Sequence, residues 1–145
     1  MHLELDISAS QDCEEIVLEV YVDQEKIFHT TASTSMQTIT HDVDESAADH
    51  QLKLVMKGKE ARHSVIDSTG QMVQDVSFKI HRLEFDEVNL YENFCQGRRS
   101  IHRHNFNSIT QPEFDDEFYG EIGCNGTVFM PFATPFYLWL ADNLW

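Results

Sequence analysis

His102 and His104 form an H-x-H pair, which is the part of this sequence that comes closest to a metal-binding motif. On a β-strand alternate side chains point to the same face, so both imidazole rings would lie side by side. Zinc and related metals need three or four converging ligands, and we consider His63 and His81 as further candidates. The sequence lacks the ligand spacing of a zinc motif. We therefore expect a solvated histidine-rich loop and no bound metal.

Acidic side chains gather at 113–117 and again at Asp86 and Glu87. Carboxylate-rich loops of β-sandwiches can bind Ca²⁺, although the spacing of an EF-hand is missing here. Paired carboxylates also carry out glycoside hydrolysis. A chain with 25 acidic residues offers many such pairs by chance. We expect a solvated acidic surface, with calcium as an open possibility and no other cofactor.

Nucleophilic catalysis has little support in the sequence. A G-x-S-x-G elbow, a Walker loop and a G-x-G-x-x-G motif are all missing. Cys13, Cys95 and Cys124 are odd in number and widely spaced, which fits neither a disulfide framework nor a CxxC zinc motif. We expect reduced thiols in a cytosol and a chain that is not an enzyme. Cys124 lies in a glycine-rich turn, where we expect a small buried apolar side chain rather than an exposed thiol.

Charge is distributed unevenly along the chain. The formal net charge of −15 divides into −11 over residues 1–52, +2 over residues 53–103 and −6 over residues 104–145. This acidity argues against non-specific binding of nucleic acid and against an anionic membrane surface. Arg98, Arg99 and Arg103 belong to the one basic cluster. They would pair either with the acidic face of a neighbouring copy or with carboxylates of the same chain, and both alternatives stay open.

The aromatic end of the chain is a second candidate contact surface. Both faces of 136–140 are apolar, and the tail carries Phe136, Trp139 and Trp145. A tryptophan at the end of a chain needs a surface to bury against, so we expect part of this tail to pack on another chain. Prolines and an aspartate interrupt the apolar stretch, and the first ten residues are not basic. We expect neither a membrane span nor a secretory signal.

The elements that must position these residues are mostly strands. Hydrophobic alternation with period two predicts strands at 3–7, 16–22, 38–43, 52–56, 76–85 and 127–134. The turn Asp67–Gly70 predicts a hairpin between 64–66 and 71–73. The phase of alternation slips at His81 and Arg82, which indicates a β-bulge or a strand that passes between sheets.

Two segments have no sustained alternation. Residues 91–120 indicate a long excursion with a short helix or turns, and 135–145 form either a strand or a short helix. We predict an all-β chain, a jelly-roll-like β-sandwich of seven to nine short strands with little helix, in one domain spanning residues 1–145.

Two stretches carry a resemblance to a known class of proteins. GKEARHSVIDSTGQMVQDVSFKIHRLEFDEVNL at 58–90 and GEIGCNGTVFMPFATPFYLWL at 120–140 resemble small virion-associated structural proteins of tailed phages, especially marine T4-like ones. The pattern hydrophobic-Asp-x-x-Gly-x-hydrophobic-hydrophobic-x-Asp is also similar to jelly-roll carbohydrate-binding modules. Such modules bind sugars through loop acids, calcium or exposed aromatic rings. The resemblance implies Asp67, Asp75, Asp86 and Glu87 as ligand-binding residues.

The resemblance implies that the chain serves to attach to, or to decorate, a larger particle. We expect a non-enzymatic structural protein of a phage particle, in head decoration or in neck or tail attachment. Its partners would be other virion proteins and copies of itself, and its location would be the virion. The alternative is a carbohydrate-binding module that recognises host surface glycans, with calcium as a possible ligand. A small hydrolase is a third and weaker hypothesis.

Overall fold

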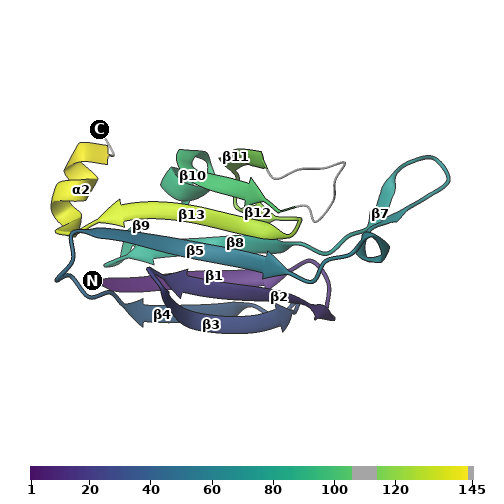
Figure 1. Ribbon diagram of the computed structural model, residues 1–145, viewed down its shortest axis with the longest axis horizontal. Coiled ribbons are helices and arrows are strands. Elements are labelled where there is room, and N and C mark those ends of the chain that lie inside the picture. The colour runs from purple at the N-terminus through teal and green to yellow at the C-terminus, as the bar shows by residue number, and fades with distance from the viewer. Residues whose placement is uncertain (106–113, 144–145) are drawn as a thin grey trace.

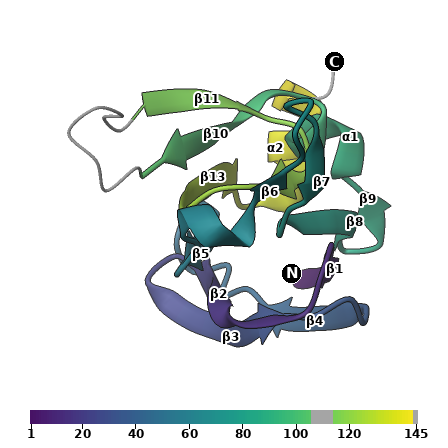
Figure 2. The same cartoon turned by 90° about the vertical axis from the view of Figure 1, so that its right-hand side faces the viewer.

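Two β-sheets pack face to face in this computed structural model (Figures 1 and 2). The structure describes residues 1–105 and 114–143, and it describes the backbone alone at 97–99. The larger sheet has the strand order β11-β10-β13-β5-β2-β3. Its strands are β11 (Phe114–Phe118), β10 (Gly97–His104), β13 (Gly126–Ala133), β5 (Asp49–Lys57), β2 (Cys13–Val22) and β3 (Glu25–Ala32).

The smaller sheet has the order β12-β8-β1-β4, and β9 pairs with β8. Its strands are β12 (Glu121–Ile122), β8 (Phe78–Phe85), β1 (His2–Ala9), β4 (Gln37–Asp42) and β9 (Val88–Asn89). The described residues hold nine strands of five or more residues and four of two or three residues. The predicted all-β sandwich is confirmed, and every strand pairing in both sheets is antiparallel.

The core lies between the sheets and follows the alternation of the sequence. Leu3 and Leu5 in β1 are fully buried, and so are Leu18 in β2 and Leu54 in β5. Each of these strands turns its intervening residues away from the core, as period two requires. The burial of one apolar face per strand fixes the register, because a slip by one residue would expose that whole face.

The predicted phase slip in β8 is a bulge at His81. The register runs from Asp6 opposite Arg82 to Ile7 opposite Ile80, so His81 is the extra residue. The bulge keeps Ile80 and Leu83 buried although they are three residues apart.

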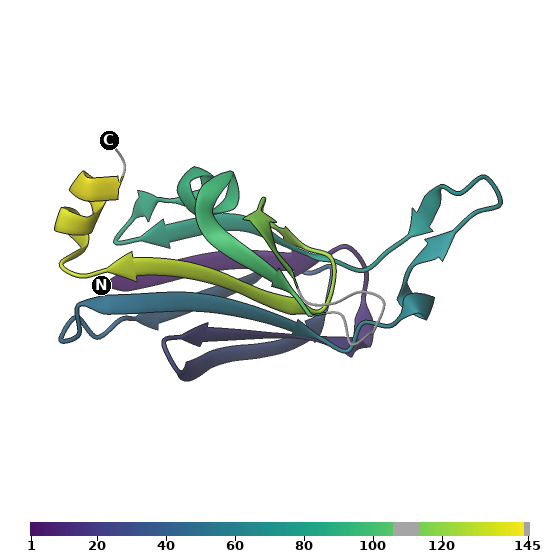
Figure 3. The same cartoon turned by 45° about the horizontal axis from the view of Figure 1, so that its top comes forward.

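The predicted hairpin projects from one end of the sandwich (Figures 1 and 3). It consists of β6 (Val65–Ile66) and β7 (Met72–Gln74) and follows the short 3₁₀ helix Ala61–His63. The Asp67 carboxylate accepts hydrogen bonds from the amides of Thr69 and Gln71, and Gly70 has φ +86°. This turn chemistry is what the Asp-x-x-Gly sequence predicted.

The excursion predicted at 91–120 is only partly correct. The short helix exists as α1 (Tyr91–Cys95), but β10 and β11 then add a ribbon to the edge of the larger sheet. The sequence hides β10 because its inward positions are polar, with Ser100 and His102 buried there. The Ser100 hydroxyl donates to the carbonyl of Phe94 at 2.6 Å, which satisfies the buried polar group.

The tail predicted as a strand or a helix is the helix α2 (Phe136–Asn143). Phe136 is buried, and the Trp139 ring stacks on Phe94 with centroids 5.7 Å apart. Among the described residues no helix has the length and apolar character needed to cross a membrane.

Candidate functional site

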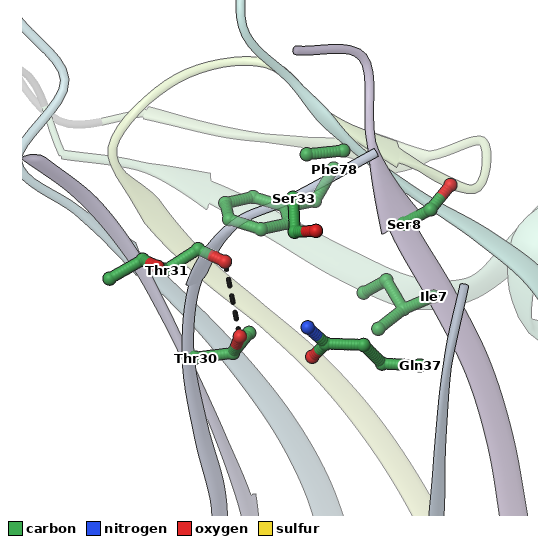
Figure 4. A pocket seen from close by; sticks show the side chains of 8 residues that line it. Ile7, Ser8, Thr30, Thr31, Ser33, Gln37 and Phe78 are labelled. Carbon is green, nitrogen blue, oxygen red and sulfur yellow. Dashed lines mark hydrogen bonds between the residues drawn. The ribbon is translucent and has the colours of Figure 1, made fainter. Parts of the chain in front are cut away.

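One hollow between the edges of the two sheets is too small to bind a ligand. It is lined by residues of β1, β3, β4 and β8 and by Ser33, and it has no space for a water molecule (Figure 4). Gln37 and Phe78 fill it, and the Thr30 hydroxyl donates to the backbone of Thr31 at 3.1 Å. Two open depressions lie on the larger sheet instead.

Successive side chains of the β10–β11 ribbon point to opposite faces, and the two faces carry different kinds of residue. Ile101 and Arg103 point away from the sandwich, and they lie opposite Glu117 and Asp115 in β11. The residue between them, His102, points inward and is 5% exposed. The ribbon thus has an outer face that meets solvent and an inner face that meets the core.

An open depression of about 310 Å³ lies against the ribbon, and Ile101, Asp115 and Glu117 of the outer face contribute to its lining. Tyr119 continues the alternation beyond β11, and its ring is 63% exposed. Its hydroxyl contacts the carboxylate of Glu117, and Glu117 is one of the residues that line the depression. The depression is lined by Ser100, Ile101, Asp115, Asp116 and Glu117.

Arg103 organises the next part of this face. Its guanidinium donates to both carboxylate oxygens of Asp115, at 2.8 and 3.1 Å. The same group lies over the Phe129 ring of β13, 5.1 Å from its centroid. A planar guanidinium held by a bidentate ion pair and a cation–π contact has few alternative positions. The pair lowers the pKa of Asp115.

The outer face continues across β5 to β2. Lys53 lies opposite Phe129 and also opposite Tyr21, and its ammonium group is 5.2 Å from the Tyr21 ring centroid. A second open depression, of about 340 Å³, begins at Lys53 and extends to Asp23 and Asp49. The rings of Phe129 and Tyr21 are thus two strands apart, about 10 Å by the usual strand spacing.

A buried carboxylate anchors this end of the face. Glu19 is 4% exposed and accepts hydrogen bonds from Lys26 at 2.6 Å, from Lys57, and from the Tyr21 hydroxyl at 2.8 Å. These donors, with Lys26 first, lower the pKa of Glu19 to about 2. We call the surface formed by Ile101, Arg103, Asp115, Glu117, Tyr119, Phe129, Lys53 and Tyr21 the outer platform.

The inner face of the ribbon holds a different cluster. The ring centroids of His102 and His104 are 4.1 Å apart, and Nδ1 of His104 is 2.7 Å from Sγ of Cys124. One ligand atom of each of these residues lies within 4.8 Å of the others. In residues 1–105 and 114–143 this is the one group of three or more histidine, cysteine or acidic side chains placed closely enough to hold a metal ion.

Burial keeps this cluster uncharged. It lowers the pKa of His102 to about 4, with a smaller effect from the neighbouring His104. Burial also lowers the pKa of His104 and raises the pKa of the Cys124 thiol. Neutral imidazoles are the form that binds metals. Both histidines share one face, as the H-x-H spacing requires on a strand, but the expected solvated loop is wrong because His102 is buried in β10. Cys124, which we expected to be a buried apolar side chain, is half-buried and contacts His104.

Of the predicted partner-binding residues, Arg103 lies on the outer platform. Phe136 differs from our expectation, because its ring is 1% exposed and stacks on Trp139 within the chain's own core. Trp139 is also packed intramolecularly. The side chains of Arg98 and Arg99, and the whole of Trp145, lie outside the described residues.

The four acids implied by the resemblance do not form one site. Asp67 is in the hairpin turn, and Asp75 accepts from Lys59 and Ser64 at the base of the hairpin. Asp86 and Glu87 form the tight turn between β8 and β9, both with positive φ. Figure 1 shows the hairpin and that turn toward opposite ends of the long axis.

No protein-family model matches the sequence, and no curated protein matches it. The β-sandwich does have counterparts among solved structures of carbohydrate-binding modules. A structure described as vCBM60 in complex with galactobiose matches 90% of this chain and 97% of its own, with a TM-score of 0.51 and 12% identity. A selenomethionine form of vCBM60 matches 89% of this chain and 88% of its own, with a TM-score of 0.48 and 11% identity. The first of these likenesses shows a shared fold.

Proposed function

We propose that this chain is a non-catalytic carbohydrate-binding module and that its outer platform binds the glycan. The observation that carries the proposal is the outer face of the β10–β11 ribbon, where the exposed Tyr119 ring adjoins an acid-lined depression. The fold that the chain shares with a module bound to galactobiose supports the same conclusion.

The chemistry of the platform suits a sugar. A pyranose has a face of C–H bonds that packs on an aromatic ring, and hydroxyl groups that both donate and accept hydrogen bonds. Tyr119 offers the ring, Asp115 and Glu117 offer acceptors, and Arg103 offers donors. Small-molecule sites commonly combine apolar surface with a few fixed polar groups in this way.

Preorganisation favours binding at this surface. Arg103 is held by Asp115 and Phe129, and Glu19 is held by two lysines and Tyr21. Side chains that are already ordered lose less conformational entropy when a ligand arrives. The row from Glu117 through Phe129 to Tyr21 crosses five strands, which offers room for more than one sugar unit.

The carboxyl groups support binding rather than hydrolysis. A glycosidase needs one carboxylic acid with a raised pKa, which protonates the leaving group. Among the described residues, every carboxyl group whose pKa departs clearly from its usual value has a lowered pKa. These groups are Glu4, Asp6, Glu19, Asp42, Asp44, Asp67, Asp75 and Asp115.

A glycan microarray probed with the purified chain tests the proposal. We expect binding to a subset of oligosaccharides, with galactobiose as the first probe in solution. Tyr119→Ala should weaken that binding about fivefold or more, since a stacking ring contributes about 1 kcal/mol or more. Tyr137→Ala removes a ring that is 72% exposed on α2 and serves as the matched control. Absence of glycan binding, or equal loss in both variants, would contradict the proposal.

The role in a phage particle is a second candidate, and the projecting hairpin favours it. Val65, Ile66, Met72 and Val73 are 41% to 59% exposed on a two-stranded ribbon outside the sandwich. Apolar side chains grouped in this way mark contact with another surface. We propose a second copy of this chain as the occupant, because the hairpin belongs to residues 53–103, whose net charge of +2 would be attracted to the net charge of −11 on residues 1–52 of another copy.

A further inference from the structure

The inner face of the β10–β11 ribbon carries side chains that the proposed glycan site does not use. From the cluster of His102, His104 and Cys124 we infer a binding site for one transition-metal ion of the zinc class. Its ligands are two imidazole nitrogens and one thiolate, and the fourth position is left for water or another small ligand. This inference is independent of glycan binding.

The backbone places the three ligands together. β10 turns His102 and His104 to the same face, while Cys124 arrives in the loop between β12 and β13. The loop is tied to the end of β10 by a hydrogen bond from the Asn105 amide to the Asn125 carbonyl, at 2.9 Å. Gly126 pairs with His104, and any Cβ at Gly126 would lie 2.2 Å from the carbonyl oxygen of Arg103. Glycine therefore allows the approach that brings Cys124 to the histidines.

The distances fit a tetrahedral ion. With metal–nitrogen bonds of about 2.0 Å and a metal–sulfur bond of about 2.3 Å, ligand atoms are about 3.3 to 3.6 Å apart. The ligand atoms of the cluster are all within 4.8 Å of one another, and the His104–Cys124 contact is 2.7 Å. The spacing of the cluster, from 2.7 Å to at most 4.8 Å, thus brackets that of a tetrahedral site.

Burial supplies an independent argument for a ligand. His102 is 5% exposed, and its Nε2 has no hydrogen-bond partner among the residues that the structure describes. A buried nitrogen without a partner has lost its hydration and gained no bond in return, so it carries an uncompensated penalty. An ion in the cluster offers a way to remove this penalty if the ring turns Nε2 toward it.

The surroundings resemble the outer shell of a metal site. Asp116 lies opposite His102 in the ribbon, and its charge acts on both histidines. Phe118 meets the edge of His102 and Phe114 stacks on His104, so apolar rings cover the cluster. His104 and Cys124 are only half-buried, which leaves a path for an ion.

The donor set selects the kind of metal. Imidazole and thiolate ligands suit zinc, cobalt, nickel and copper, whereas calcium and magnesium require oxygen ligands. The thiol must lose its proton on binding, so the ion displaces one proton from Cys124. A bound ion would join the β12–β13 loop to β10 beneath the outer platform.

Cobalt titration of the chelator-treated chain tests the inference. We expect one Co²⁺ per chain, a thiolate-to-cobalt charge-transfer band in the near ultraviolet, and loss of that band when Zn²⁺ is added. Cys124→Ser should abolish the band, and His102→Gln should weaken binding at least about 100-fold, because even outer-shell changes weaken it 10- to 100-fold. Cys13→Ser and His29→Gln are the matched controls, and both should bind like the wild type.

A second measurement does not depend on the folding of variants. Alkylation of the wild-type chain, mapped by mass spectrometry, compares Cys124 with Cys13 in the presence and absence of Zn²⁺. We expect Zn²⁺ to slow alkylation of Cys124 about tenfold or more and to leave Cys13 unchanged. Cobalt bound without a thiolate band, or equal alkylation of Cys124 with and without Zn²⁺, would overturn the inference.

Discussion

Nδ1 of His104 lies 2.7 Å from Sγ of Cys124, although the residues are twenty positions apart in the sequence. One belongs to the edge ribbon and the other to the loop that leads into the central strand β13. Their contact joins the β12–β13 loop to the inner face of β10. Arg103, which lies between the two histidines in the sequence, points the other way and belongs to the outer platform. One strand thus carries residues of both proposed sites, the glycan surface on one face and the metal cluster on the other.

Zinc should stabilise the folded chain through this cluster. A ligand that binds only the folded state at about 100 times its Kd adds about 2.7 kcal/mol to the free energy of unfolding. We expect the Tm to rise when Zn²⁺ is added to the wild type and to stay constant in Cys124→Ser. An equal rise in both proteins would show that the ion acts elsewhere.

Glu19→Gln should lower the free energy of unfolding by about 1 to 3 kcal/mol at neutral pH, because the buried negative charge that pairs with Lys26 and Lys57 is lost. The pKa of Glu19 is lowered to about 2 in the folded chain, so its stabilising effect is complete above the pKa of the unfolded chain. The effect fades as the pH falls toward 2. Denaturant unfolding should therefore show the wild-type advantage shrinking between about pH 5 and pH 2.

Glu14→Gln is the control for this prediction, since Glu14 is exposed on the same strand. It should change the free energy of unfolding by less than about 0.5 kcal/mol. If the advantage over Glu19→Gln were the same at low and neutral pH, the ion-pair account of Glu19 would be wrong.

Gly126→Ala should destabilise the pairing of β10 with β13. The new Cβ would lie 2.2 Å from the carbonyl oxygen of Arg103, so backbone must move. We expect a loss of about 1 to 3 kcal/mol in chemical unfolding, as for other overpacked positions. Gly123→Ala is the matched control, because a Cβ there meets nothing within 4 Å. A similar loss in both variants would point to the loop sequence rather than to the close approach.

The projecting hairpin gives a test of self-association. If copies of the chain meet through it, replacing Ile66 and Val73 by serine should shift sedimentation velocity toward the monomer. The sandwich should keep its Tm, since both side chains are more than half exposed. A wild-type chain that sediments as a monomer at high concentration would contradict association through the hairpin.

Much of the fold could be predicted because the core strands alternate. β1, β2, β5 and β8 each bury one apolar face, and the Asp67 turn and the His81 bulge have local chemical signals. The ribbon β10–β11 has no such signal, because its inward positions hold serine and histidine. The burial of Ser100 depends on its hydrogen bond to the Phe94 carbonyl, and that of His102 on its edge contact with the Phe118 ring of the neighbouring strand.

The candidate site was less predictable for the same physical reason. The H-x-H pair was visible, but the third ligand depends on how the loop at 123–125 returns to β10. Tyr119 is a candidate binding residue because its hydroxyl contacts Glu117, which lines the depression. That arrangement depends on how the strands pair and has no signal in the sequence. Phe136 was expected on a docking surface, but it begins helix α2 and packs in the core of its own chain.

Mapping of amide chemical shifts during a glycan titration tests the proposed function most directly. The titrant is the oligosaccharide that binds most strongly on the microarray. We predict that the largest shifts occur at Ile101, Arg103, Asp115, Glu117 and Tyr119, with smaller ones toward Lys53 and Tyr21. Shifts centred on the β6–β7 hairpin or on α2, or a microarray without any bound glycan, would contradict the outer platform as a carbohydrate-binding surface.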